Sequence, residues 1–356
     1  MPGRRLPPRP FAVALALLLL LLVTLHVRTG SGGTFAPDEI LRGVLATFGW
    51  GEPLEGSDQA FVRLRLFRAL TAAGVGAALA LSGSLLQGLF RNGLASPSLI
   101  GVTAGAALGA AVTIMLVGGY GPGLFVEHGA ALAPVLVTAA GFVGALVTGF
   151  LVLSLATSGG RISVPTLLLV GVAVNTCVAG VLAAIQSLTL GDVEIVRAIM
   201  SWTFGTLDDR SPYHAVIVWS GVAVAFAIIP FVATELDLFG GGEDDALALG
   251  VNVPLVKILT LIGAALASAS AVAVAGQIAF VGLIVPHLVR LLTGHSHRTL
   301  LPLSLLAGAS FLLGADLLQR TFLSGTTLQP GVVMSILGGP FFLFLLLRNR
   351  NLVKAW

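Results

Sequence analysis

Charged side chains are scarce in this chain of 356 residues. Lysine, arginine, aspartate and glutamate together make up 10% of the sequence, whereas a soluble domain carries charge on roughly a quarter of its residues. Apolar residues make up 56%, and the mean hydropathy is +1.00. So few charges cannot cover a soluble fold, and the composition therefore indicates a membrane protein whose surface mostly faces lipid. It excludes soluble enzymes, DNA-binding modules and disordered tails.

Cysteine and lysine are almost absent as well. The single cysteine, Cys177, lies in an apolar run, which excludes disulfides within the chain and clustered thiolate metal sites. The two lysines, Lys257 and Lys354, each follow a valine, so the chain has no G-x-x-x-x-G-K-[ST] phosphate loop, and any ATP must be hydrolysed by another polypeptide. His295 and His297 have no third candidate metal ligand nearby. We therefore expect no enzyme, no metal and no cofactor, and a net charge of +3 is too small to indicate nucleic-acid binding.

Ten runs of the sequence are apolar enough to span a membrane. A spanning helix needs about 20 mostly apolar residues, and fewer where neighbouring helices bury a short segment. The runs lack the period-two alternation of barrel strands, so we predict an all-α fold, a polytopic membrane helical bundle of ten transmembrane helices. Only residues 275–279 separate the seventh run from the eighth. The runs are 11–27, 66–86, 99–117, 130–156, 164–188, 213–232, 255–274, 280–292, 301–318 and 331–347.

The distribution of basic residues predicts the orientation. Arg4, Arg5 and Arg9 before the first run would also suit a signal peptide, but no small-x-small cleavage site follows, so we expect a retained first helix. With the N-terminus in the cytoplasm, ten crossings also place the C-terminus there. The inner side then carries eleven basic and five acidic residues, and the outer side eight and eleven. This bias agrees with the positive-inside rule.

Three arginines violate this rule at the predicted outer entrance of the second helix. Arg63, Arg65 and Arg68 lie together there, and Asp316 and Arg320 lie one helical turn apart near the outer end of the ninth helix. We expect an ion pair between Asp316 and Arg320 that holds the arginine in place. Two interpretations of the arginines stay open: they reach to lipid phosphates, or they form a docking site for an acidic partner.

The longest predicted inner loop, 236–254, has the pattern of a short capped helix. Three acidic residues follow three glycines, at a position where the helix dipole favours negative charge. A later glycine suits a left-handed cap. Because a helix this short is unstable alone in water, we expect its apolar residues to dock on another protein, although a solvated connector is the alternative. The acidic residues are Glu243, Asp244 and Asp245, the apolar residues Ala246, Leu247 and Leu249, and the glycine Gly250.

Eight motifs occur in a fixed order along the chain. They are RLFR at 65–68, GAALALSG at 76–83, QGLFRN at 87–92, LASPSLIG at 94–101, WTFG at 202–205, ALG at 248–250, GQIAFVGLIVPH at 276–287 and GGPFF at 338–342. In these motifs the chain resembles the FecCD-type (type II) permease subunits of bacterial ABC importers, which take up iron–siderophore complexes, haem and vitamin B12. The resemblance covers nearly the whole chain after residue 60.

The resemblance implies an architecture and three sites. The architecture is a single transmembrane permease domain, 1–356, that forms a homodimer around a central path, lined mainly by the fifth and tenth helices, with both termini cytoplasmic. The loop 236–254 would contact the cytoplasmic ATPase subunit through residues Glu243 to Gly250. The residues implied for docking an extracytoplasmic substrate-binding protein are Arg65, Arg68 and Arg320. Those implied for an inner gate are Ser163, Val164, Pro165 and Thr166.

The expected function is transport without covalent chemistry. We predict a permease subunit in the bacterial cytoplasmic membrane that translocates a ferric siderophore, haem or cobalamin. Its predicted partners are a second permease subunit, ABC ATPase subunits, a binding protein and the lipid bilayer. The alternative is a secondary carrier coupled to an ion gradient, which would normally need titratable residues at mid-membrane, where this chain has few. Instead, Gly101, Gly105 and Gly109 recur at four-residue spacing, which indicates close packing of the third helix.

Overall fold

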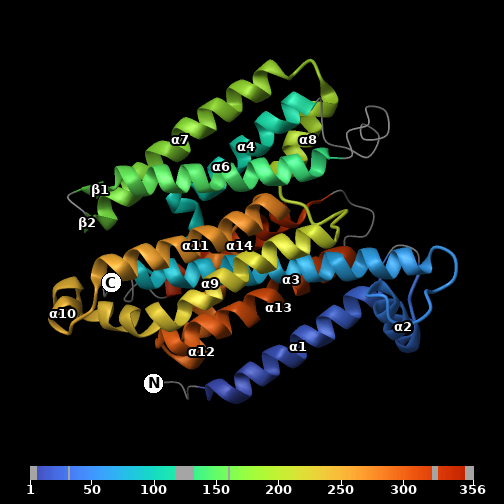
Figure 1. Cartoon of the computed structure of the whole chain (residues 1–356), viewed down its shortest axis with the longest axis horizontal. Coiled ribbons are helices and arrows are strands. Elements are labelled where there is room, and N and C mark those ends of the chain that lie inside the picture. Colours follow the sequence, from blue (N-terminus) through green and yellow to red (C-terminus); the bar gives the residue numbers. More distant parts are fainter. Residues whose placement is uncertain (1–5, 31–32, 118–131, 159–160, 323–327, 349–356) are drawn as a thin grey trace.

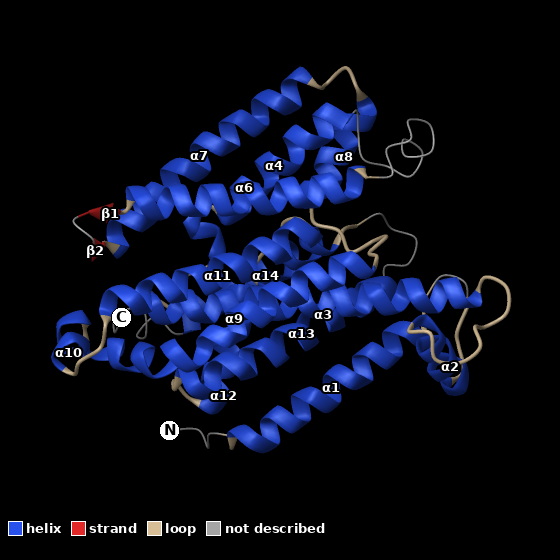
Figure 2. Ribbon diagram, viewed as in Figure 1, coloured by secondary structure: helices blue, strands red, loops and turns tan. Residues whose placement is uncertain are grey.

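The computed structural model describes residues 6–30, 33–117, 132–158, 161–322 and 328–348. This described chain is helical, apart from a short antiparallel pair of two-residue strands, β1 (Thr157–Ser158) and β2 (Arg161–Ile162) (Figure 2). Ten of its helices coincide with the ten apolar runs: α1 (Pro8–Arg28), α3 (Asp58–Leu89), α4 (Val102–Val117), α6 (Ala133–Leu155), α7 (Val164–Leu188), α9 (Pro212–Leu238), α11 (Val253–Ala275), α12 (Val281–Thr293), α13 (His297–Phe322) and α14 (Pro330–Arg348). The shorter elements are α2 (Pro37–Thr47), α8 (Val193–Thr203), α10 (Glu243–Ala248) and the 3-10 turns Pro97–Ile100 and Phe239–Gly241.

Length divides the ten helices into two groups. Seven helices of the described chain are long and apolar enough to cross a membrane, namely α1, α3, α6, α7, α9, α11 and α13. The other three, α4, α12 and the Pro330–Phe344 part of α14, are apolar but shorter. The all-helical fold class is confirmed. A count of ten crossings stays a prediction, because short helices cross only where neighbours bury their ends.

The seventh and eighth runs form separate helices. The break between α11 and α12 contains two residues in the left-handed region, Gly276 with φ of 70° and Phe280 with φ of 68°. A side chain at position 276 would also clash with the carbonyl oxygen of Trp202. Glycine is therefore required at the end of α11 for both conformation and space.

Helix α3 forms the centre of the bundle. Of its most apolar stretch, 94% is buried, against α9, α11, α12 and α13. Backbones approach closely here: a Cβ atom at Gly76 would clash with the carbonyl of Gly308, and one at Gly83 with the carbonyl of Gly282. Small residues at such crossings let membrane helices pack by van der Waals contact where no hydrophobic driving force exists.

A second close contact joins α4 to α6. The predicted packing face is confirmed for Gly105 and Gly109, where an added Cβ would clash with the carbonyls of Gly144 and Ala140. Gly101 differs from the prediction, because it precedes α4 and adopts a left-handed conformation with φ of 81°. Figure 1 shows α4, α6 and α7 along one side of the bundle and α1 along the opposite side.

The helices run between two ends of the molecule, which we call the α10 end and the α2 end (Figure 1). At the α10 end, the backbone N–H of His297 donates to Asp237 Oδ1 at 2.8 Å, so that the end of α9 meets the start of α13. At the α2 end, Arg65 Nη1 donates to Val27 O at 3.0 Å, so that the start of α3 meets the end of α1. Helix α1 begins at the α10 end and finishes at the α2 end.

Two short helices were not predicted. Asp192 caps α8, since its carboxylate accepts hydrogen bonds from the backbone N–H groups of Glu194 (3.0 Å) and Ile195 (3.1 Å). At the start of α2, Glu39 Oε2 accepts from the backbone N–H of Ala36 at 2.7 Å, and Pro37 occupies the first helical turn. Both are recognised helix-start signals, but each helix has only 11 residues and does not appear in a search for apolar runs.

Candidate functional site

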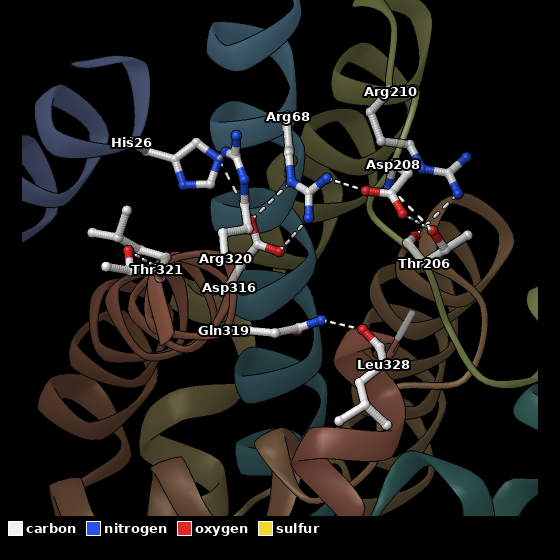
Figure 3. A network of polar contacts seen from close by, with 11 residues as sticks. His26, Arg68, Thr206, Asp208, Arg210, Asp316, Gln319, Arg320, Thr321 and Leu328 are labelled. Carbon is white, nitrogen blue, oxygen red and sulfur yellow. Dashed lines mark hydrogen bonds and ion pairs between the residues drawn. The ribbon is translucent and has the colours of Figure 1, made fainter. Parts of the chain in front are cut away.

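Arg68 is the centre of a charged cluster at the α2 end (Figure 3). Its Nε and Nη2 atoms donate to Asp316 Oδ2 and Oδ1 at 3.0 and 2.7 Å, which is the bidentate geometry that suits a guanidinium and a carboxylate. Its Nη1 atom also forms an ion pair with Asp208, which lies in the segment between α8 and α9. The side chain of Asp316 is fully buried, whereas that of Asp208 is 66% exposed. Arg68 therefore has one buried and one exposed carboxylate partner.

The expected ion pair between Asp316 and Arg320 is wrong. Asp316 uses both oxygens to accept from Arg68 on α3, and Arg320 Nη1 instead lies 2.9 Å from His26 Nε2 on α1. The same His26 Nε2 also lies 3.4 Å from Asp316 Oδ2, so the imidazole stands between the arginine and the aspartate of α13. The error has a simple cause. Spacing along α13 brings Asp316 and Arg320 to neighbouring positions, but it says nothing about the closer cation on a facing helix.

Arg65 is buried, with 4% of its surface exposed. Its guanidinium donates to the carbonyl oxygens of Val27 (3.0 Å) and Gly33 (3.0 Å), and its Cζ atom lies 4.8 Å from the ring centroid of Phe35. These contacts tie α3 to the end of α1 and to the segment before α2. Arg65 therefore stabilises the packing of α3 beside the cluster from a buried position. Arg63 on the same helix is exposed.

Arg65, Arg68 and Arg320, the three predicted docking residues, do come together. Arg68 bonds to Asp316 on the same helix as Arg320, and a Cβ atom at Gly30 would meet the guanidinium atoms of both Arg320 and Arg65. Asp208 belongs to the same cluster and was missed. Its backbone N–H donates to Thr206 Oγ1 at 3.1 Å. No sequence signal links Asp208 to Arg68, since 140 residues separate them.

The short helix predicted in the loop 236–254 is present as α10, and its cap is the expected one. Gly250 has a φ of 86° and donates to Leu247 O at 2.9 Å, while the N–H of Val251 donates to Ala246 O at 3.0 Å. These two bonds form a Schellman motif. Ala246 is fully buried, whereas Leu247 and Leu249 are 52% and 67% exposed. The capped helix thus presents two leucines at the surface of the α10 end.

The remaining predicted site residues form the first turn of α7. Ser163 Oγ accepts from the backbone N–H of Thr166 at 3.4 Å and hydrogen-bonds to Thr166 Oγ1 at 2.9 Å, and Pro165 sits at a position where its missing N–H costs nothing. Figure 1 places this turn, next to β1 and β2, at the same end as α10. The gate assigned to Ser163, Val164, Pro165 and Thr166 stays a prediction.

No group of three potential metal ligands occurs within the described ranges of the chain. Polar side chains at the α10 end serve helix junctions instead: His297 Nδ1 lies 2.6 Å from Asp237 Oδ1, and Ser296 Oγ donates to Asp237 Oδ2 at 3.0 Å. Asp237 thereby accepts from the backbone N–H of the first residue of α13, one of the donors that a helix start leaves without an intrahelical partner.

A bundle of apolar helices with ionic contacts at its two ends defines a multi-pass membrane protein. The model of the FecCD transport family matches residues 17–348, and the chain belongs to this family. It is a permease of the ABC importer class, and it has no ATP-binding loop of its own.

The relatives carry different metal compounds. The chain is 41% identical over 289 residues to the cobalamin import permease BtuC of Halobacterium salinarum, covering 81% of this chain and 73% of that protein. It is 36% identical over 301 residues to the hemin transport permease HmuU of Yersinia pestis, covering 82% and 84%. It is 33% identical over 291 residues to the Fe(3+)-citrate import permease YfmD of Bacillus subtilis, covering 81% of each. A solved metal-chelate type ABC transporter in an inward-facing conformation superposes with a TM-score of 0.79 and 27% identity, covering 96% of this chain and 99% of that one.

Proposed function

We propose that this chain forms the translocation path of an importer for a metal held in an organic chelate. The relatives are named for cobalamin, hemin and ferric citrate, which share a metal ion inside an organic ligand and differ in almost everything else. A path lined by small and apolar side chains suits such varied cargo better than a tight polar pocket does. The particular chelate is set by the binding protein that delivers it.

The proposed arrangement in the membrane has ten crossings and both termini in the cytoplasm of a bacterial cell. Two observations support it: helices run alternately between the α10 end and the α2 end, and basic residues are enriched on the side assigned to the cytoplasm. The α10 end would then be the cytoplasmic end, and the α2 end the outer one. Two copies would pair around a two-fold axis, as most homo-oligomers do, with the path at their interface.

The single observation that carries the proposal is that the two ends of the bundle carry different surfaces: exposed leucines at the α10 end and an arginine cluster at the α2 end. At the α10 end, a preformed helix exposes Leu247 and Leu249, which a partner ATPase would bury. At the α2 end, Arg68 and Arg320 are partly exposed, and acidic side chains of a binding protein would meet them there. Arg65 takes part by holding the other two in position, since its own guanidinium is buried. The first turn of α7, Ser163 to Thr166, is the proposed inner gate.

Reconstituted transport tests this function. The chain is purified together with the ATPase that accompanies it, placed in liposomes, and offered hemin, ferric citrate and cyanocobalamin with the matching binding protein. We expect uptake of one of these chelates that requires ATP and the binding protein. Uptake by the chain alone, driven by a proton or sodium gradient, would instead establish the secondary carrier.

A further inference from the structure

An ion pair fixes α10 to the long helix α11. Lys257 Nζ lies 2.7 Å from Glu243 Oε2, and the lysine side chain is only 6% exposed while the glutamate side chain is 38% exposed. A lysine buried this deeply requires compensation, because an ammonium group is costly to remove from water. Helix α10 has six residues, too few to hold a position by itself. The ion pair therefore helps to fix where α10 stands relative to α11.

The other end of α11 contacts the charged cluster. The carbonyl of Ala275, the last residue of α11, accepts from the backbone N–H of Thr206 at 2.8 Å. Thr206 in turn hydrogen-bonds to Asp208, the exposed partner of Arg68. Of the most apolar stretch of α11, 72% is buried, so the helix is held along its length by its neighbours. One rigid helix thus connects the segment proposed to bind the ATPase with the loop that contacts the proposed docking arginine (Figures 1 and 3).

We propose that Lys257 is a positioning residue for transport: through Glu243 it makes α10 and α11 move as one body, so that a displacement of α10 reaches the loop that carries Asp208. The inference rests on the proposed function, in which an ATPase binds α10. Coupling between two sites is reciprocal. Contact between a binding protein and Arg68 would therefore also change how tightly α10 binds the ATPase. We expect stimulation of ATP hydrolysis as the kinetic readout of that change.

The first experiment breaks the pair from the lysine side in the complete complex. Lys257→Met keeps the length of the side chain and removes the charge, while Leu247 and Leu249 remain available, so the ATPase should still co-purify. Two quantities should fall by about fivefold or more, which is the lower range of typical coupling between sites. One is the stimulation of ATP hydrolysis by the binding protein. The other is the uptake of the chelate that the wild type carries, whether hemin, ferric citrate or cyanocobalamin. Lys257→Arg keeps the cation and should retain most of the stimulation.

The second experiment uses charge reversal and a matched control. Lys257→Glu alone should lose stimulation and uptake, and adding Glu243→Lys should restore part of both, because the pair is rebuilt with opposite sense. Glu243→Gln, changed at a half-exposed position, provides a variant that should fold even if the buried lysine tolerates no change. Arg42→Met is the control, since it breaks an ion pair with Asp38 in which both side chains are exposed.

The outcomes separate this inference from the function on which it rests. If wild-type complex forms and transports but Lys257→Met and Glu243→Gln behave like it, Lys257 does not position α10. The same conclusion follows if the double reversal is no better than Lys257→Glu. If the wild-type chain binds no ATPase at all, the proposed function itself fails.

Discussion

Arg65 and Arg68 lie three residues apart on α3, yet their surroundings differ. Arg65 is enclosed by backbone carbonyls and aromatic rings, whereas Arg68 joins a buried carboxylate to an exposed one. From the sequence, both residues were assigned the same docking role, because only their charge was visible. Their different burial means that substitutions at the two positions should affect different properties of the protein.

Replacing Arg65 should affect folding. Arg65→Gln leaves the carbonyls of Val27 and Gly33 without their charged donor, and we expect a loss of about 3 kcal/mol, since unmet buried groups cost roughly 1–3 kcal/mol each. The unfolding temperature of the purified protein in detergent should fall by several degrees. Arg63→Gln, an exposed change on the same helix, should leave that temperature unchanged. An unaltered unfolding temperature for Arg65→Gln would show that its bonds are dispensable.

Replacing Asp208 should affect docking. Asp208 occupies one side of the Arg68 guanidinium, so in the proposed docking an incoming carboxylate of a binding protein would have to compete with it. Because Asp208 is largely exposed, its pair is worth about 1 kcal/mol at most. Asp208→Asn should therefore tighten binding of the binding protein by about two- to fivefold at low salt, measured by titration, and less at high salt.

The neighbouring acid provides the control for this prediction. Asp209 is exposed and has a left-handed backbone with φ of 53°, which asparagine tolerates well, so Asp209→Asn changes the same net charge without touching Arg68. If Asp208→Asn weakens binding instead, Asp208 is itself a contact for the partner and does not compete with it.

At the scale of elements, α10 is the part most exposed to a partner. Leu247→Asp combined with Leu249→Asp should detach the ATPase, because two apolar contacts of about 1.5–3 kcal/mol each are replaced by charges that must lose water. Co-purification of the ATPase from solubilised membranes measures this. The paired change Leu41→Asp and Leu45→Asp in α2 alters two exposed leucines at the opposite end and should leave the ATPase bound. If the α10 variant retains the ATPase, α10 is only a solvated connector and does not bind the ATPase.

The close crossings of α3 give a second prediction at this scale. Gly83→Ala gains up to about 1 kcal/mol of helix propensity but forces a methyl group onto the carbonyl of Gly282. Relief of that clash requires backbone movement that costs about 1–3 kcal/mol or more, so the yield of folded protein and its unfolding temperature should fall. Gly180→Ala in α7 has no atom within 4 Å of the added methyl and should be neutral or slightly stabilising. Equal behaviour of the two variants would mean that α3 tolerates wider packing.

The sequence predicted elements far better than contacts between them. Continuous apolar runs are visible because lipid demands them, which explains why all ten runs are helices, and the three glycines before Glu243 indicated the start of α10 correctly. Helices α2 and α8 were missed because amphipathic helices of this length give no such run. The partners of Asp316 and Arg65 were missed because they lie on another helix or in the segment before α2. Such pairing depends on packing that one sequence does not display.

At the scale of the whole molecule, α7 shares with α1 the lowest coverage by its own chain among the seven long helices. Only 17% of its most apolar stretch is buried, and Leu169, Val181 and Leu188 are exposed. In the proposed dimer, a two-fold axis brings the same surface of each copy together. Cys177 lies exposed on α7 and is the single cysteine of the sequence, which makes it a natural probe.

Cross-linking in native membranes should therefore give a dimer through Cys177. A bismaleimide with a long spacer should produce a species of twice the mass, and Cys177→Ser should abolish it. Protein that transports but yields only monomer with spacers of every length would contradict a path shared by two α7 helices.

The glycine contacts of α3 also decide which parts of the molecule are free to change shape. Gly76 and Gly83 are seven residues, or about two turns, apart and fit against Gly308 and Gly282 on two different neighbours. Rotating or sliding α3 would turn leucine and alanine side chains onto those carbonyls. We therefore expect α3 to keep its position relative to α12 and α13. Opening and closing of a path is then expected of helices outside this α3, α12 and α13 unit, such as α7, whose Gly171 fits instead against the carbonyl of Leu99 in the turn before α4. A spin label on α7 should change its distance from one on α9 during the ATP cycle, while a label pair on α3 and α13 should not.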